Sequence, residues 1–151
     1  PSHVKKVAVI VDAKDQFIEQ IKDYFDYFQL HGNEDLKRTK EIRQKFNKKI
    51  IKAIKITNEI SAKSYSEFED EVDMLLFDSP AMEKTAKFDW NILTKLKIKK
   101  PYLVAGSVNI NNVDEVLKYN PYGIDVSAGL ESSLGVKSKT KIIEFLKKVK
   151  V

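Results

Sequence analysis

Short apolar runs alternate along the chain with longer segments in which apolar residues recur at helical spacing. Most of the runs are too short for helices and are rich in Val, Ile and Leu, which is typical of strands buried on both faces of a sheet. We therefore predict a β-strand at each run. The runs lie at residues 7–11, 27–30, 50–56, 74–77, 102–105 and 123–126.

The segments between these runs carry the apolar stripe of amphipathic helices. In a helix predicted over 15–26, Phe17, Ile21, Tyr24 and Phe25 fall on one face. Residues that favour helix N-caps precede the later segments. The predicted caps are Asn33 for a helix over 34–46, a capping box formed by Ser64 and Glu67, and Asp89, Asn112 and Ser138 for the last three helices.

Strand and helix alternate six times, ending in a helix whose Ile142, Phe145, Leu146 and Val149 are expected to face inward. The connections are tight and no linker interrupts them, so we predict one α/β domain over residues 1–151. Such alternation produces a parallel sheet with right-handed crossovers. Two architectures fit this order, an open doubly wound sheet and a barrel, and periodicity does not separate them.

Composition excludes several classes of protein. The mean hydropathy is −0.37 and no apolar run approaches the ~18 residues of a membrane span. The chain has no cysteine, which excludes disulfides and thiolate metal sites and fits a cytoplasmic protein. The two histidines are far apart and the carboxylates show no ligand spacing, so we expect no metal. No nucleotide-binding or hydrolase motif is present, and no cofactor is expected.

The net charge of +5 raises the question of an anionic partner, either nucleic acid or a phosphorylated metabolite. All but two of the 27 basic residues are lysines, the exceptions being Arg38 and Arg43. Readers of nucleic acid favour arginine, whose planar fork binds phosphates and bases through two hydrogen bonds. The lysines are scattered over the predicted helices, which indicates a solvated surface rather than a nucleic-acid site.

Polar and small residues follow each predicted strand. In either architecture, the carboxyl ends of parallel strands lie at one edge of the sheet, where ligands collect. The residues at these ends are Asp12, then Gln29, His31 and Gly32, then Lys55, then Asp78 and Ser79, then Gly106 and Ser107, and last Ser127, Ala128 and Gly129.

The last two of these ends resemble one another. Residues 105–112, AGSVNINN, and 125–132, DVSAGLES, each place small residues after a strand and before a helical turn. Backbone N–H groups freed in such a loop bind anions, and two adjacent loops favour phosphate. The alternative is that tight strand-to-helix turns use Gly and Ser for their own geometry.

Two further side chains have both a chemical and a structural interpretation. Asp78 ends the run MLLFD, where a partly desolvated carboxyl group at the mouth of a sheet can serve as a general acid. It can equally cap a helix or form a structural ion pair. His31, in QLHG, can donate to a substrate or satisfy backbone groups.

Several stretches taken together resemble the phosphoribosylanthranilate isomerase family of tryptophan biosynthesis. They include FQLHGNED at 28–35, MLLFDS at 74–79, KFDWNIL at 87–93, YLVAGSVNINNV at 102–113 and the segment 122–145. The resemblance covers essentially the whole chain, and the motifs occur in the family's order. It implies a (β/α)₈ barrel that catalyses an Amadori rearrangement of N-(5′-phosphoribosyl)anthranilate, a small phosphorylated substrate, without a cofactor.

The resemblance also implies roles for the residues that match the family's motifs. An aspartate at the corresponding strand end is the family's general acid, which implies this role for Asp78. The QLHG element places Gln29 and His31 near the substrate, and Asp12 stands where the family usually carries Asn. The implied phosphate ligands are Gly106, Ser107, Ser127, Ala128 and Gly129.

Two larger departures from the family's pattern affect whole segments of the chain, and Gly106-Ser107 also replaces the family's paired glycine. Its six units match barrel strands three to eight, so the first two units, which carry the family's cysteine base and an arginine, are absent. The loop at 79–86 has no glycine where the family has a flexible glycine-rich loop. We expect an incomplete (β/α)₈ TIM-type barrel that is inactive or nearly so alone and that associates through its open sheet edges.

Two explanations for the missing units remain open: a longer enzyme that has been cut, and a natural remnant. The activity also has an alternative, a non-catalytic module that binds phosphorylated ligands through the same loops. A basic nucleic-acid-binding domain ranks last, because it requires lysines concentrated on one face.

Overall fold

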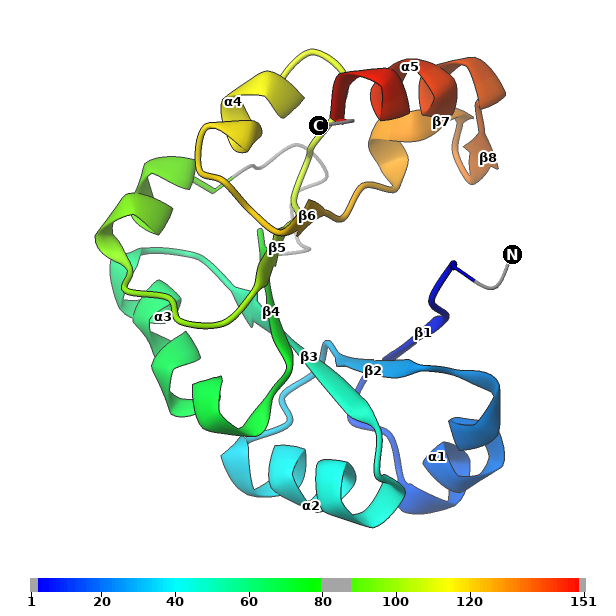
Figure 1. The fold of residues 1–151 in the computed structure, drawn as a ribbon, viewed down its shortest axis with the longest axis vertical. Helices are drawn as coiled ribbons and strands as arrows, with labels where there is room; N and C mark the ends of the chain where they lie inside the picture. Colours follow the sequence, from blue (N-terminus) through cyan, green and yellow to red (C-terminus); the bar gives the residue numbers. More distant parts are fainter. Residues whose placement is uncertain (1–2, 80–87, 150–151) are drawn as a thin grey trace.

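A computed structural model describes residues 3–79 and 88–149 and places six strands in one parallel sheet. The strands pair in sequence order, and the sheet curves with helices along its convex side (Figure 1). All six predicted strands are confirmed, although the last is shorter than expected. They are β1 (Val7–Ile10), β2 (Tyr27–Leu30), β3 (Lys49–Lys55), β4 (Met74–Asp78), β5 (Tyr102–Val104) and β6 (Gly123–Ile124).

Among the described residues, four α-helices and several 3₁₀ segments lie between the strands, and a fifth α-helix follows the last strand. The α-helices are α1 (Asp15–Ile21), α2 (Leu36–Phe46), α3 (Glu59–Lys63), α4 (Val113–Leu117) and α5 (Lys139–Val149). The 3₁₀ segments are Lys22–Tyr24, Ser64–Glu67, Glu69–Glu71, Trp90–Lys95 and Ala128–Leu130, and a short antiparallel hairpin joins β7 (Glu131–Ser133) to β8 (Val136–Lys137). In the described part of the chain, no helix combines the length and the apolar character needed to cross a bilayer.

The two sides of the sheet have different packing. Alternate residues of a strand point to opposite sides, and one set lies under the helices in the main core. That set includes Phe28, Leu30, Ile50, Ile54, Leu75, Phe77 and Val104. The other set lies on the concave side and forms a much smaller cluster of Ile51, Ala53, Leu76 and Ala105.

The first helix corrects one sequence prediction. Phe17 and Tyr24 were expected to face inward, but they are 50% and 66% exposed, whereas Ile18 is completely buried. The α-helix ends at Ile21 and continues as a 3₁₀ turn. Because the residues per turn change there, a stripe calculated for one α-helix over 15–26 does not describe the buried face.

The helix caps were predicted in part. Asp89 and Ser138 accept hydrogen bonds from Asn91 N and Lys141 N as expected, and Asn112 precedes α4 without a side-chain cap.

Two other predicted caps were wrong. Asn33 is not the cap of α2, because its amides bind Asp12, and Asp35 accepts from Arg38 N at 2.7 Å instead. The capping box at Ser64 and Glu67 was also wrong; the box is formed by Asn58, the N-cap of α3, and Ser61 in its first turn.

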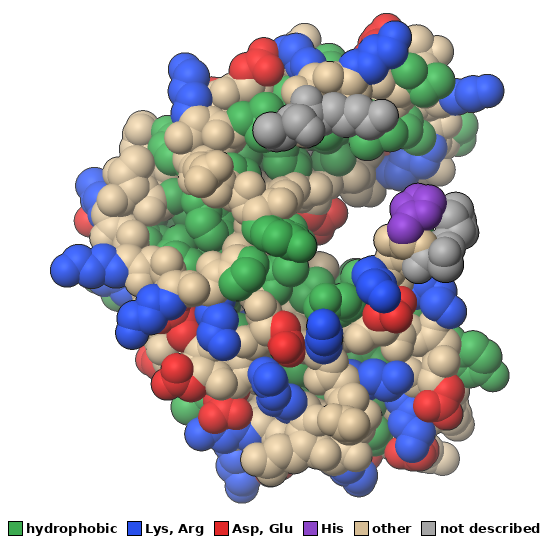
Figure 2. All heavy atoms as spheres, viewed as in Figure 1, with side chains coloured by type: hydrophobic (Ala, Val, Ile, Leu, Met, Phe, Trp, Pro, Cys, Tyr) green, Lys and Arg blue, Asp and Glu red, His purple; other side chains and the backbone are tan. Residues whose placement is uncertain are grey.

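Both edges of the sheet are open in the described structure. β1 pairs with β2 alone and β6 with β5 alone, so a notch separates them (Figures 1 and 2). On the β1 side, Val9 and Val11 are 60% and 62% exposed. On the β6 side, Leu146 was expected to be inward but is 49% exposed, because it lies in an uncovered apolar groove of about 290 Å³ between β6 and α5.

We expect Phe77→Ala to lower the free energy of unfolding by about 3–5 kcal/mol, because it removes a large side chain from the main core. Phe77 is fully buried, and its ring meets those of Tyr65 and Tyr102 edge to face, with centroids 5.9 and 5.7 Å away. Urea unfolding measures the change. Phe17→Ala, at a half-exposed position, is the control and should cost less than about 1 kcal/mol; equal losses would contradict the assigned core.

Candidate functional site

The carboxyl ends of β4, β5 and β6 surround one cavity of about 220 Å³. Asp78 forms one part of its wall, and the two loops predicted to bind phosphate form the rest. Every residue predicted as the general acid or a phosphate ligand lies in this wall. The lining residues are Asp78, residues 105–108 and residues 125–129.

Glycine allows the loops to come this close. A Cβ atom on Gly129 would lie 2.2 Å from the carbonyl oxygen of Val108, so the loops after β5 and β6 meet at this point. A Cβ atom on Gly106 would lie 2.0 Å from Ser79 Oγ at the end of β4. Gly106 and Ser107 both have left-handed φ angles, of 85° and 54°, a conformation that favours glycine at the first position.

Backbone amides line this cavity without a partner in the described structure. The N–H groups of Gly106, Ser107, Ser127, Ala128 and Gly129 donate to no other described residue. Consecutive amides in a tight loop form a concave site for an anion. The second loop is followed by a single 3₁₀ turn and the hairpin, and α4 has only five residues, so the site depends on loop amides rather than on a helix dipole.

Other side chains hold these two loops in place. The side-chain amide of Asn112 donates to the carbonyl of Ser107 at 2.9 Å, and Asn112 Oδ1 accepts from Asn109 N at 2.8 Å. The ammonium group of Lys137 donates to both the carbonyl and the hydroxyl oxygen of Ser127, at 2.9 and 2.8 Å. The loops are therefore shaped before any ligand arrives.

A polar chain runs from β2 to Asp78 on the concave side. His31 Nε2 lies 3.2 Å from Asp78 Oδ2, and Gln29 Nε2 lies 3.0 Å from His31 Nδ1. The second carboxylate oxygen of Asp78 accepts from Ser79 N at 2.8 Å. β3 lies between β2 and β4, so the curvature of the sheet brings His31 and Asp78 together.

Asp125 belongs to the same cluster, and sequence reasoning missed it. The residue as a whole is exposed, yet the protein around its carboxyl group removes enough water to raise the pKa of that group. The charge of Asp78 raises this pKa further, whereas His31 acts in the opposite direction. The available signal was an acidic residue directly after β6, comparable with Asp78 at the end of β4.

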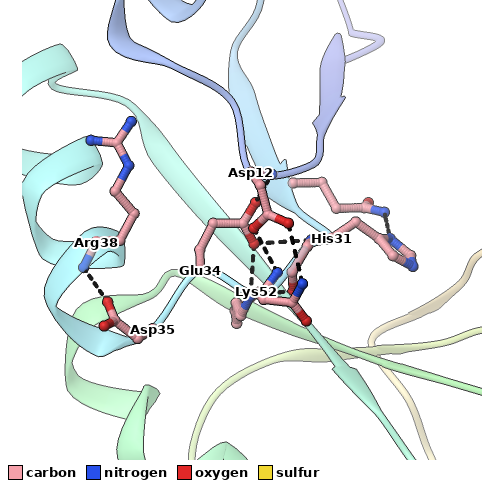
Figure 3. Close-up of polar contacts among 9 residues, drawn as sticks. Asp12, His31, Glu34, Asp35, Arg38 and Lys52 are labelled. Carbon is pink, nitrogen blue, oxygen red and sulfur yellow. Dashed lines mark hydrogen bonds and ion pairs between the residues drawn. The ribbon is translucent and has the colours of Figure 1, made fainter.

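A second, buried network ties the loops after β1 and β2 to Lys52 in the middle of β3 (Figure 3). Glu34 accepts hydrogen bonds from Asp12 N at 2.7 Å, Gly32 N at 2.9 Å and Lys52 Nζ at 2.9 Å. The side chains of Lys52 and Glu34 are 4% and 2% exposed. The carboxylate of Asp12, predicted to bind substrate, is held by both amides of Asn33. Sequence reasoning found neither Glu34 nor Lys52.

Two remaining predictions fall outside these networks. Lys55 ends β3 and is exposed. The glycine-free loop predicted over 79–86 lies, apart from Ser79, outside the described residues. Within residues 3–79 and 88–149, no group of three His, Asp or Glu side chains is placed to hold a metal ion.

Known proteins resemble this chain over nearly its whole length. The family model for N-(5′-phosphoribosyl)anthranilate (PRA) isomerase matches residues 1–148. The isomerase of Petrotoga mobilis is 36% identical over 99% of this chain and 73% of its own. A solved isomerase from Thermotoga maritima covers 97% of this chain and 73% of its own, with TM-score 0.86 and 26% identity. A PRA isomerase solved with reduced 1-(o-carboxyphenylamino)-1-deoxyribulose 5-phosphate covers 97% and 72%, with TM-score 0.83 and 26% identity.

We expect Lys52→Met to lower the free energy of unfolding by about 3–5 kcal/mol, because it leaves the buried Glu34 carboxylate unpaired. The double variant Lys52→Met/Glu34→Gln should recover most of this loss, since no buried charge remains. Chemical denaturation of the set measures the coupling. Lys95→Met, which removes the exposed partner of Glu59, is the control and should change stability by less than about 1 kcal/mol. Equal losses at Lys52 and Lys95 would exclude a buried pair.

Asp125 should make stability depend on pH. Its folded pKa is raised, so the bound proton stabilises the fold below the ordinary value of 3.8, and this contribution is lost as pH rises through the folded value. Asp125→Asn should therefore be more stable than the parent chain at pH 7, and the difference should shrink toward pH ~4. Urea unfolding at both pH values tests this, with Val126→Ala as a neighbour whose effect should not depend on pH.

Proposed function

The chain belongs to the N-(5′-phosphoribosyl)anthranilate isomerase family of tryptophan biosynthesis. From this premise we propose that it carries the general acid and the phosphate-binding site of that isomerase. One observation supports this most directly. Asp78 shares a cavity with all five residues of the two phosphate loops. A general acid and a phosphate-binding site in one cavity fit a substrate whose bound phosphate holds the reacting part of the molecule beside the acid.

The proposed reaction begins at the ribose ring of the substrate. Asp78 donates its proton to the ring oxygen while the bond from that oxygen to C1′ breaks. Removal of the C2′ proton by a base then gives an enol, which becomes the ketose product. His31 and Ser79 N contact the two oxygens of Asp78 and thereby stabilise the carboxylate that remains after proton transfer.

The phosphate of the substrate is proposed to bind the amides of the loops after β5 and β6. Gly106, Ser107, Ser127, Ala128 and Gly129 all face the cavity and have no other described partner for their N–H groups. The ligand in the related solved complex is itself a 5-phosphate. The other proposed substrate contacts are His31 and, at the rim of the mouth, Asp12. Gln29, whose amide meets His31, takes part through that histidine.

We propose that these 151 residues alone do not turn over substrate. The family resemblance implies a cysteine as the base, and the chain has no cysteine. The sheet is also open between β1 and β6, where the resemblance implies two further βα units of the barrel. The exposed valines of β1 and the apolar groove beside β6 are the surfaces that such units would cover, and without them we expect self-association.

A second candidate function is a non-catalytic module that binds phosphorylated ligands. The observation that favours it is the absence of cysteine, because the phosphate loops do not depend on the missing base. The two candidates agree on ligand binding and differ on turnover when the absent units are supplied.

The test combines binding and turnover. The chain should bind reduced 1-(o-carboxyphenylamino)-1-deoxyribulose 5-phosphate in a calorimetric titration, and Gly129→Ala should weaken binding at least about tenfold, because its Cβ would push the two loops apart. Turnover should be absent until the first two βα units of the Petrotoga mobilis isomerase are added as a separate peptide. Asp78→Asn should then lower turnover by about 10²–10⁴-fold while keeping ligand binding.

Gly135→Ala is the control for the glycine substitution: its Cβ would meet no atom within 4 Å, and the strain from its left-handed φ of 78° falls in a hairpin turn outside the cavity. It should leave binding unchanged. Rapid turnover by the 151 residues alone would overturn the proposed inactivity. Binding without turnover in the mixture would favour the non-catalytic module, and no binding at all would reject both candidates.

A further inference from the structure

Gln29 is a buried polar residue whose position calls for an explanation. It is 6% exposed, and its neighbours Phe28 and Leu30 are fully buried in the main core on the other side of the sheet. Gln29 lies in β2, and His31 comes two positions later, directly after the last residue of the strand. Both side chains therefore lie on the concave side. The side-chain amide of Gln29 meets the imidazole of His31 at 3.0 Å.

The hydrogen-bonding capacities of these groups determine where the proton lies. The amide nitrogen of Gln29 carries two protons and no acceptor, so His31 Nδ1 accepts from it. A neutral imidazole has one N–H group, which must then be on Nε2. Nε2 is the nitrogen 3.2 Å from Asp78 Oδ2. The N–H of His31 therefore points at the carboxylate of Asp78.

We propose that Gln29 is a positioning residue that holds His31 in the Nε2–H tautomer, so that His31 donates a hydrogen bond to Asp78. Ser79 N donates to Asp78 Oδ1 and His31 Nε2 contacts Asp78 Oδ2, so both oxygens of the Asp78 carboxylate are held in place. This donor stabilises the carboxylate once its proton has moved to the substrate. The inference deepens the proposed role of Asp78 and rests on it for its catalytic meaning.

The tautomer can be read without any turnover. The chain has two histidines, so ¹⁵N-histidine labelling gives two ring systems, and His3→Asn leaves His31 alone. Long-range proton–nitrogen correlation spectra distinguish a protonated ring nitrogen from an unprotonated one. We expect neutral His31 to show a proton on Nε2 and a lone pair on Nδ1. A proton mainly on Nδ1 in the parent chain would overturn the proposal at once.

Substitutions at Gln29 then test its part. Gln29→Met keeps the length of the side chain and removes the donor, so the Nδ1–H tautomer should become populated. Gln29→Glu offers only an acceptor, so His31 Nδ1 should carry a proton in this variant. Gln20→Met, at an exposed position on α1, is the matched control and should leave the His31 spectrum unchanged.

The outcomes separate this inference from the proposed function. A His31 spectrum unaltered in Gln29→Met and Gln29→Glu overturns the role of Gln29, whatever the isomerase assay shows. If Gln29→Met does not fold, Gln29→Glu and the parent spectrum still decide. The expected tautomer together with a failed ligand titration supports the positioning contact and rejects the proposed function alone.

Discussion

The alternation of side chains along each strand decides which groups can meet in this protein. Phe28, Leu30 and Phe77 enter the core under the helices, so Gln29, His31 and Asp78 point to the concave side. Because the strands are parallel and neighbouring in sequence order, their carboxyl ends open toward one mouth. The polar side chains of the candidate site therefore lie on the concave side of the sheet, opposite the main core.

Two kinds of contact hold the residues at the carboxyl ends of the strands in place. Around the cavity, loops pack backbone against backbone, and Gly106 and Gly129 permit the approach. A buried Glu34–Lys52 pair joins the loops after β1 and β2 to β3 through charged hydrogen bonds. A buried pair of this kind adds little net stability, because desolvation offsets attraction. Its effect here is to hold the QLHG turn, and hence His31, beside Asp78.

Openness of the sheet explains the surface features that differ from expectation. Leu146 and the β1 valines have the spacing of buried residues, but they lie beside β6 and β1, where the described sheet ends. Tyr24 differs for a local reason, since it lies in the 3₁₀ turn after α1, and within α1 Ile18 rather than Phe17 is buried in the core. Asn33 is not the cap of α2, because Asp12 binds both of its amides and Asp35 accepts from Arg38 N instead. The capping box lies at Asn58 and Ser61, and the turn at Ser64–Glu67 has no side-chain cap.

The sequence by itself determined the six strands, their order and the polar residues at their ends, because periodicity and turn chemistry are local properties. It also placed Asp78 and the two loops predicted to bind phosphate at one edge. Only the tertiary structure decided which side chains pair. Glu34 meets Lys52 across 18 residues of chain, and His31 meets Asp78 across a curved sheet. Such contacts depend on the curvature of the sheet and the register of its strands, which no local sequence pattern encodes. Asp125 lies near Asp78 because of the same curvature and register.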